Sequence, residues 1–249
     1  MQEKNTHFGY QEVSPEEKTE KVNAVFDSVA SKYDVMNDVM SFGMHRIWKH
    51  QFAFLANVRT GFKVLDLAAG TADVSALLAT KLADQGELTL CDLNLAMLEH
   101  GRAKLVDRGL LKNLHYVQAM AEDLPFRENY FDRVVIAFGL RNFTDKSQAL
   151  QAIFRVLKPG GQLLILEFSK PHKWLRKAYD IYSFGFLPKM GKLVASDAGS
   201  YRYLAESIRK HPDQSTLHAM LESAGFQQCD YLDLHFGVVC IHRGYKLSA

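Results

Sequence analysis

From residue 62 onward the sequence alternates short apolar runs with longer amphipathic stretches, and this rhythm constrains the fold more than any other feature. The apolar runs lie at residues 62–68, 87–91, 114–119, 131–138 and 162–168. Between them apolar side chains recur at helical spacing, as in the stripe of Val74, Leu77, Leu78 and Leu82. Strands that alternate with helices are typical of a parallel sheet covered by helices on both faces. The sequence therefore predicts an α/β fold.

Two helices are expected in front of this repeat. Apolar residues recur at helical spacing within residues 22–33 and again within residues 44–55. The first twenty residues are polar and acidic, so we expect them to be poorly ordered or loosely docked.

The end of the chain departs from the strand–helix rhythm. Within the repeat, Asp145 is a predicted helix N-cap. After the repeat, Asp213 and Gly225 mark the start and the end of a last helix. The final strands, residues 228–234 and 237–243, lie too close in sequence to enclose a crossover helix. We therefore expect them to be antiparallel.

The whole chain, residues 1–249, is predicted to form one Rossmann-like domain with a mostly parallel sheet and an antiparallel last strand. N-terminal helices and a helical lid insertion complete the expected architecture. The predicted parts are a flexible start (1–20), the N-terminal helices (21–60), a cofactor-binding core (61–169), the lid (170–210), and a C-terminal helix with a strand hairpin (211–249).

Composition excludes several classes of protein. Hydrophobic residues make up 47% of the chain and charged residues 23%, which excludes a disordered or collagenous chain. The apolar runs are too short to span a membrane, and the N-terminus lacks the apolar region of a secretory signal. Three scattered cysteines suggest no disulfide framework or metal site. The few cysteines and the missing signal make a reduced, cytoplasmic compartment the expectation, and a net charge of +2 suggests no nucleic-acid partner.

The loop after the first strand of the repeat, residues 66–73, carries a single glycine, Gly70. A dinucleotide-binding loop would carry three glycines, so a nicotinamide or flavin cofactor fits poorly. A ligand without phosphates needs a less close approach, and S-adenosylmethionine is such a ligand. Its carboxylate could use backbone N–H groups near Gly70, where the helix dipole favours an anion. Asp66 could face its ammonium group and Thr71 could donate from its hydroxyl; an ordinary tight turn capped by Asp73 is the alternative.

Two further rim positions follow the next strands. Asp92 ends the second strand, where a carboxylate can accept hydrogen bonds from both ribose hydroxyls. The alternative is an N-cap shared with Asn94, and the two roles are compatible. After the third strand, the Ala121 N–H and a carboxylate of Glu122 or Asp123 could read the adenine edge. Met120 would pack on the adenine face, although a solvated acidic loop is an alternative for the carboxylates.

Several segments, spread over about residues 6–246, match the motifs of a known family. They are residues 33–41 with His45 and Trp48, 66–73, Asp92, 121–122, 138–142, 155–161 continuing to 167–169, and 200–208. Together they resemble the ubiquinone/menaquinone biosynthesis C-methyltransferase family, a branch of the class I S-adenosylmethionine-dependent methyltransferases. The resemblance implies methylation of a ring carbon of a polyprenylated quinol, either demethylmenaquinol or 2-polyprenyl-6-methoxy-1,4-benzoquinol.

The same resemblance implies cofactor contacts at Thr71, Asp92, Met120 and Ala121. The sequence departs from the family pattern at a few positions near the cofactor. Ala69 and Ala72 replace glycines that many members carry, and Ala137 replaces a serine that some carry.

An aromatic ring carbon is a weak nucleophile unless a neighbouring hydroxyl loses its proton, so the site should stabilise a phenolate or hold a base. Arg141 and Asn142 follow the fourth strand on the ligand-facing rim. We expect Arg141 to stabilise the phenolate or to position a water that acts as base, with Asn142 beside it. An arginine tied to a nearby carboxylate is the alternative. His45 and Tyr201 are weaker acid–base candidates.

The predicted lid is aromatic and basic. Seven of the 30 residues from 174 to 203 are aromatic, and residues 170–192 carry six Lys or Arg against the single acid Asp180. This composition favours reversible association with the anionic inner face of the cytoplasmic membrane, where an isoprenoid substrate resides. A packed helical cap with a solvated basic face is the alternative. Other enzymes of quinone biosynthesis are expected partners, and the oligomeric state is not predicted.

Two other functions fit the sequence less well. One is a methyltransferase that acts on an oxygen or nitrogen of a small molecule, and the other is a non-catalytic module that binds the cofactor.

Overall fold

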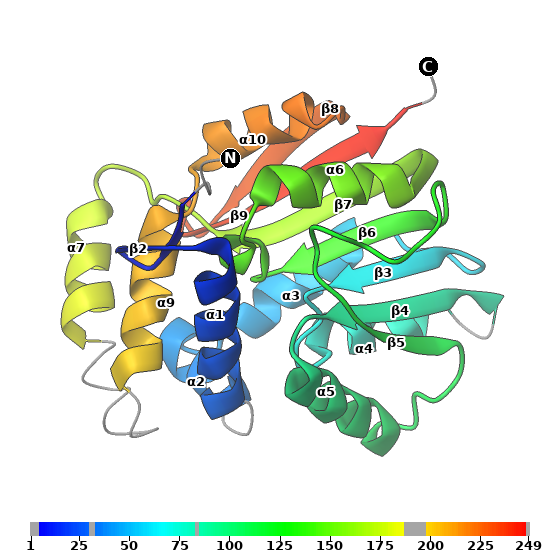
Figure 1. Ribbon diagram of the computed structural model, residues 1–249, viewed down its shortest axis with the longest axis horizontal. Helices are drawn as coiled ribbons and strands as arrows, with labels where there is room; N and C mark the ends of the chain where they lie inside the picture. Colours follow the sequence, from blue (N-terminus) through cyan, green and yellow to red (C-terminus); the bar gives the residue numbers. More distant parts are fainter. Residues whose placement is uncertain (1–4, 30–32, 83–84, 187–197, 248–249) are drawn as a thin grey trace.

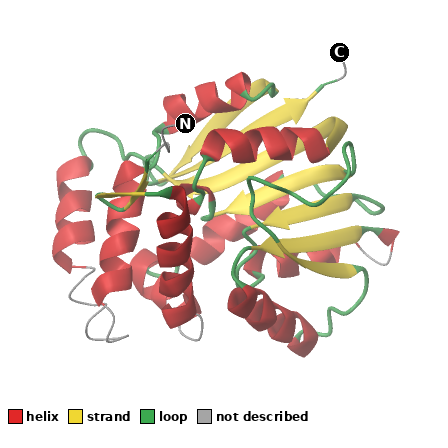
Figure 2. Cartoon of the chain, viewed as in Figure 1, coloured by secondary structure: helices red, strands yellow, loops and turns green. Residues whose placement is uncertain are grey.

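The computed structural model describes residues 5–29, 33–82, 85–186 and 198–247. Its centre is a seven-stranded sheet with the order β5-β4-β3-β6-β7-β9-β8, drawn in yellow in Figure 2. The strands are β3 (Lys63–Leu67), β4 (Glu87–Asp92), β5 (Leu114–Gln118), β6 (Phe131–Ala137), β7 (Leu157–Phe168), β8 (Gln227–Leu234) and β9 (Val239–Lys246).

The strands from β5 to β7 are parallel, and β9 runs antiparallel to both β7 and β8. The predicted mostly parallel sheet with an antiparallel last strand is therefore confirmed. The strand order reverses between β3 and β6, and ligands of open α/β sheets bind at such a switch, beyond the carboxyl ends of the strands.

Helices cover both faces of the sheet, as Figures 1 and 2 show. The helices are α1 (Pro15–Val29), α2 (Tyr33–Ser41), α3 (Met44–Leu55), α4 (Asp73–Leu82), α5 (Leu95–Asp107), α6 (Lys146–Val156), α7 (Arg176–Asp180), α9 (Ala198–Lys210) and α10 (Gln214–Ser223). One apolar core lies between the sheet and helices α3, α4 and α5. A second core lies between the opposite face and helices α6 and α10. Both cores follow from the alternation of side chains along each strand.

The two helix starts predicted by capping residues are confirmed. The Asp145 carboxylate accepts from the backbone N–H groups of Ser147 and Gln148, and Asp213 accepts from the N–H of Thr216. Strand β7 begins at Leu157, five residues before the predicted start at 162. A register shift opposite the first residues of β6 absorbs the extra residues, and sequence periodicity does not reveal such an irregularity.

The beginning of the chain is more ordered than its composition suggests. Strands β1 (Thr6–Phe8) and β2 (Gln11–Val13) form a hairpin in front of α1. The Phe8 ring stacks on Tyr203 of α9 with 4.2 Å between centroids. Lys18 of α1 is buried and donates to the Phe143 carbonyl at 2.7 Å. These contacts join residues distant in sequence, so local composition could not predict them.

Helices α1, α2, α7 and α9 stand together at one end of the sheet, on the left in Figure 1. A small apolar cluster of Val29, Met40, Tyr201 and Leu204 joins α1, α2 and α9. The turn η4 (Ile181–Phe186) follows α7, and residues 187–197 of the predicted lid lie outside the described residues. The division of the chain into core and lid stays a prediction. Among the described segments, no helix combines the length and apolarity needed to cross a membrane.

Candidate active site

The loop between β3 and α4 has an unusual backbone. Ala68, Gly70 and Ala72 all adopt the left-handed region, with φ of 57°, 52° and 62°. An L-residue pays roughly 1–2 kcal/mol for this conformation, whereas glycine does not. The departure from glycine at Ala72 is therefore tolerated at an energetic cost, because neighbouring contacts hold the loop. The Ala69 N–H, for example, donates to the Cys91 carbonyl of β4 at 3.2 Å.

A cavity, open to solvent on one side, lies beside this loop at the carboxyl ends of the strands. Six of the residues predicted for the site line it: Gly70, Asp92, Met120, Ala121, Glu122 and Asn142. Helix α1 supplies another wall, made of Thr19, Val22, Asn23 and Phe26. The sequence did not predict this wall, because a helical stripe does not show which element it will cover.

The Asp92 carboxylate is held by backbone donors of two segments. Its Oδ2 accepts from the Gly70 N–H at 2.8 Å, and its Oδ1 accepts from the Asn94 N–H at 2.9 Å. Burial raises the pKa of this carboxyl above its ordinary value, although the backbone donors oppose that shift. Asn94, not Asp92, caps α5 by accepting from the Met97 N–H. Each carboxylate oxygen can accept a further bond, so Asp92 fits a ligand with neighbouring hydroxyls.

Asp66 and Thr71 line a second, smaller hollow along the same loop. Ala68, Gly70, Ala137 and Phe138 border both this hollow and the main cavity. The two spaces therefore follow one continuous stretch of loop, and Ala137 brings no hydroxyl to either.

The Asp66 carboxylate is fully enclosed within the fold. Its Oδ2 accepts from the Ser75 hydroxyl at 2.6 Å, and the residue is 1% exposed. Burial raises the pKa of Asp66 to about 7, so the carboxyl is partly protonated near neutral pH.

Glu122 lines the main cavity, but one oxygen of its carboxylate is already bound by the backbone. Glu122 Oε1 accepts from the backbone N–H groups of Thr144 and Asp145 at 2.7 and 3.0 Å. Asp123 is exposed. Met120 is 38% exposed at the cavity mouth, where a flat apolar ligand surface could cover it.

Arg141 and Asn142 lie in the turn η3 (Leu140–Asn142) that follows β6. The Arg141 side chain is buried and paired with Glu167 of β7, Nη1 to Oε1 at 2.8 Å, and also donates to the Phe138 carbonyl. Asn142 lines the cavity, and its Oδ1 accepts from the Tyr203 hydroxyl at 2.9 Å. Arg141 thus has the geometry of the alternative interpretation, an arginine paired with a nearby carboxylate. The sequence did not predict Tyr203 as the partner of Asn142.

His45 and Tyr201, the weaker acid–base candidates, do not line the main cavity in the described part of the chain. His45 Nε2 lies 2.8 Å from Asp38 Oδ1, and burial lowers the pKa of the imidazole. Tyr201 is fully buried in the cluster that joins α9 to α1 and α2.

Asp73 begins α4, but its carboxylate is paired with two lysines instead of capping the helix. Lys49 of α3 lies 2.7 Å from Oδ2, and Lys104 of α5 lies 2.5 Å from Oδ1. The sequence alone did not single out either lysine. The basic residues on α3 were the available sequence signal for a cationic site. Lys104 could not be predicted, because tertiary packing alone brings α5 to the same carboxylate.

The residues present fit S-adenosylmethionine. The main cavity offers an apolar wall and the Asp92 carboxylate at the end of β4. The hollow along the loop offers the N-terminus of α4, whose dipole favours an anion, beside the buried carboxyl of Asp66. A pyrophosphate would need the close backbone approach that three glycines allow, and this loop has alanines there.

A reversed strand order, carboxylates at the carboxyl ends of the first two strands of the repeat and a cavity beside them are the features of a class I S-adenosylmethionine-dependent methyltransferase. The comparison with known families agrees and is more specific. Residues 14–246 match the ubiE/COQ5 methyltransferase family, and the chain belongs to this family. The predictions of a methyltransferase and of S-adenosylmethionine as its methyl donor are thereby confirmed.

Similar curated proteins cover nearly the whole chain. The ubiquinone/menaquinone biosynthesis C-methyltransferases UbiE of Shewanella sp. (strain W3-18-1) and Shewanella oneidensis are each 58% identical, over 98% of this chain and 97% of theirs.

Solved structures of low sequence identity share the fold. A SAM-dependent methyltransferase from Aquifex aeolicus matches with a TM-score of 0.59 and 18% identity, covering 79% of this chain and 88% of that chain. The [4+2]-cyclase SpnF matches with a TM-score of 0.68 and 16% identity, covering 93% of this chain and 97% of that chain. At such identities the likeness shows the architecture alone.

Proposed function

We propose that this chain methylates a ring carbon of a polyprenylated quinol, because its relatives are named ubiquinone/menaquinone biosynthesis C-methyltransferases. The observation that carries the proposal is the 58% identity to the UbiE proteins over 98% of the chain. The apolar side of the cavity supports it, because Val22, Phe26, Phe138 and Phe143 can pack against a ring.

Asn142 is the residue proposed to contact a ring oxygen, since its side chain lines the cavity. When bound, S-adenosylmethionine supplies a methyl group activated by a sulfonium. The Tyr203 hydroxyl holds Asn142 Oδ1, which leaves the amide N–H₂ free to donate toward a developing phenolate. Arg141 and Glu167 hold the turn in place, so Arg141 acts through the position of Asn142.

The test compares methyl acceptors with labelled methyl donor. Detergent-solubilised demethylmenaquinol should be methylated in its reduced form and not in its oxidised form, because only the quinol ring is electron-rich. A catechol and a simple amine are the control acceptors. Preferred methylation of either control would favour the oxygen or nitrogen methyltransferase, and cofactor binding without any turnover would favour the non-catalytic module.

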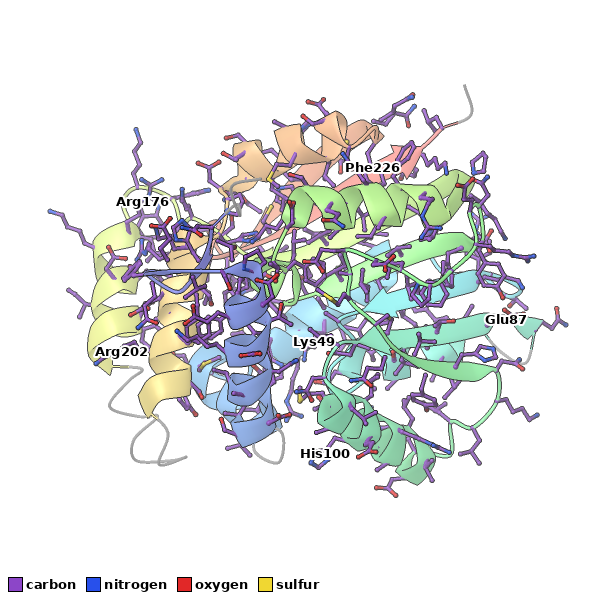
Figure 3. The ribbon with its side chains drawn as sticks, in the orientation of Figure 1. Lys49, Glu87, His100, Arg176, Arg202 and Phe226 are labelled. Carbon is purple, nitrogen blue, oxygen red and sulfur yellow. The ribbon has the colours of Figure 1, made fainter. Side chains whose placement is uncertain are left out.

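Association with the membrane surface is a further part of the proposal. Trp174 and Ile181 are 67% and 74% exposed at the start and end of α7. Lys173, Arg176 and Lys177 are exposed beside them, and Figure 3 places Arg176 at the outer edge of the molecule. Exposed aromatic and aliphatic groups among basic side chains suit the interface of an anionic bilayer. The proposed location is therefore the inner face of the cytoplasmic membrane, near other quinone-biosynthesis enzymes.

Vesicle flotation tests this surface. The protein should float with phosphatidylglycerol vesicles and much less with phosphatidylcholine vesicles, and Lys173→Gln/Lys177→Gln should weaken the flotation. Lys112→Gln/Arg127→Gln removes two exposed charges that precede β5 and β6, at the opposite ends of the strands, and should have little effect. Equal flotation with both lipids would remove the electrostatic part of the proposal.

A further inference from the structure

One carboxylate, that of Asp73, lies between two ammonium groups from different helices. The Lys49 side chain is 10% exposed and the Lys104 side chain 22% exposed. Burial by itself would raise the pKa of Asp73, but the two lysines hold that pKa well below its ordinary value. The carboxylate is therefore ionised, and the trio carries one positive charge in excess.

The two lysines differ in what they face. Lys104 lines a surface hollow that also contains Arg46, His50 and Arg108. Lys49 lines that hollow too, and it also lines the hollow along the cofactor loop, with Asp66 and Thr71. Figure 3 shows Lys49 at the centre of the molecule, beside the sheet. Lys49 is therefore the cation among the described residues that borders the loop hollow.

The excess positive charge belongs to the trio of Lys49, Lys104 and Asp73, and Lys49 is the lysine of this trio that borders the loop hollow. Among the described residues, the hydrogen-bond partner of the Lys49 ammonium is Asp73, which it shares with Lys104. Asp66 is close enough to interact electrostatically with Lys49, but it is partly protonated near neutral pH. An ammonium so removed from water is stabilised by an anion that accepts its remaining N–H groups.

We infer that Lys49 binds the carboxylate of the cofactor's amino-acid arm, at the hollow formed by the loop and the first turn of α4. Thr71 and the backbone N–H groups at the start of α4 lie along the same hollow, and the helix dipole there also favours an anion. Lys49 thus contributes to cofactor recognition from α3, a helix that precedes the sheet.

A purely structural role for Lys49 is the alternative, because its ion pair also ties α3 to α4. The chain offers a matched control for that role. Lys104 pairs with the other oxygen of the same carboxylate, yet it does not line the loop hollow. Loss of either lysine leaves Asp73 one partner, so both variants should fold.

The experiment measures the binding of two nucleosides by calorimetry. S-adenosylhomocysteine carries the amino-acid arm, whereas 5′-methylthioadenosine lacks it. Lys49→Gln should weaken S-adenosylhomocysteine binding about ten- to hundredfold, the range expected for a charge-assisted hydrogen bond. It should leave 5′-methylthioadenosine binding unchanged. Lys104→Gln should leave both affinities near those of the unaltered protein, and Lys49→Arg should restore much of the S-adenosylhomocysteine affinity.

Two outcomes overturn the inference. One is an equal loss of both nucleosides in Lys49→Gln, which would show a distorted loop. The other is an equal loss of S-adenosylhomocysteine binding in Lys49→Gln and Lys104→Gln, which would show an effect through Asp73. Lys49→Met, which keeps the apolar stem, gives the same comparison if the glutamine variant does not fold.

Discussion

Two aspartates near the carboxyl ends of neighbouring strands show how the surroundings of a carboxyl group decide its protonation and its access to a ligand. Asp66 is the last but one residue of β3 and Asp92 is the last residue of β4, and both were predicted to contact the cofactor. Asp92 reaches the main cavity with two backbone donors on its oxygens. Asp66 is enclosed with one hydroxyl donor, and its pKa rises to about 7. The difference lies in what packs around each carboxylate.

Asp92→Asn should weaken S-adenosylhomocysteine binding about tenfold or more, because a charged acceptor for the ribose hydroxyls becomes a neutral amide. Isothermal calorimetry measures the change. Asp123→Asn, an exposed carboxylate that follows the neighbouring strand, is the control and should bind normally. An unchanged affinity in Asp92→Asn would argue against the assignment of the ribose contact.

Asp66 should make the stability of the fold depend on pH. Because its folded-state pKa of about 7 exceeds the ordinary 3.8, the unfolded chain ionises first as the pH rises. Its stabilising contribution is full below about pH 4 and is lost as the pH rises through 7. Relative to Asp66→Asn, the free energy of unfolding should fall by about 4 kcal/mol between pH 4 and pH 8. Urea titrations at several pH values measure it, and a constant difference would contradict the raised pKa.

At the scale of elements, two contacts bring the site together across the sequence. The turn after β6 presents Asn142 to the cavity, and Tyr203 of α9 holds its amide. Helix α5 packs closely on the cofactor loop at Gly101, where an added Cβ would lie 2.9 Å from the Gly70 carbonyl oxygen. Each element thus depends on a partner from another part of the chain.

Tyr203→Phe should lower kcat several-fold and leave S-adenosylhomocysteine affinity unchanged, because Asn142 loses the hydroxyl that orients it. Tyr182→Phe removes a different hydroxyl, which donates to the Met40 carbonyl at 2.9 Å, and serves as the control. Steady-state kinetics with the reduced quinol distinguishes the two variants. Equal kcat values for Tyr203→Phe and the unaltered protein would show that Asn142 needs no such orientation.

Gly101→Ala should destabilise the fold by up to about 2 kcal/mol net, because the overpacked methyl group pushes α5 from the loop at a cost of up to about 3 kcal/mol. The intrinsic gain of alanine in a helix, about 1 kcal/mol, offsets only part of this cost. Thermal unfolding measures the change. His100→Ala, an exposed neighbour in the same helix, should be nearly neutral, and a stabilised Gly101→Ala would show that the loop can move aside.

At the scale of the whole molecule, the cavity is closed by parts of the chain that precede and follow the sheet. Helix α1 forms one wall, and α1 is in turn held by the hairpin of β1 and β2 and by α9. Ligand binding should therefore stabilise all of these parts together.

S-adenosylhomocysteine at about one hundred times its Kd should raise the free energy of unfolding by about 2.7 kcal/mol, since it binds the folded chain alone. Differential scanning fluorimetry would record this as a higher Tm, and Asp92→Asn should show a smaller shift at the same concentration. NAD should leave Tm unchanged. A shift with NAD and none with S-adenosylhomocysteine would contradict the cofactor assignment.

The sequence by itself determined the sheet, its antiparallel end, the helix caps at Asp145 and Asp213, and part of the cavity lining, including Asp92 and Ala121. These features follow from local rules, because periodicity and capping depend on neighbouring residues and parallel strands bring their carboxyl ends to one edge. Tertiary structure alone decided that Arg141 pairs with Glu167, that Tyr203 holds Asn142, and that α1 covers the cavity. Such contacts join segments far apart in the chain, and no local pattern specifies which of them will meet.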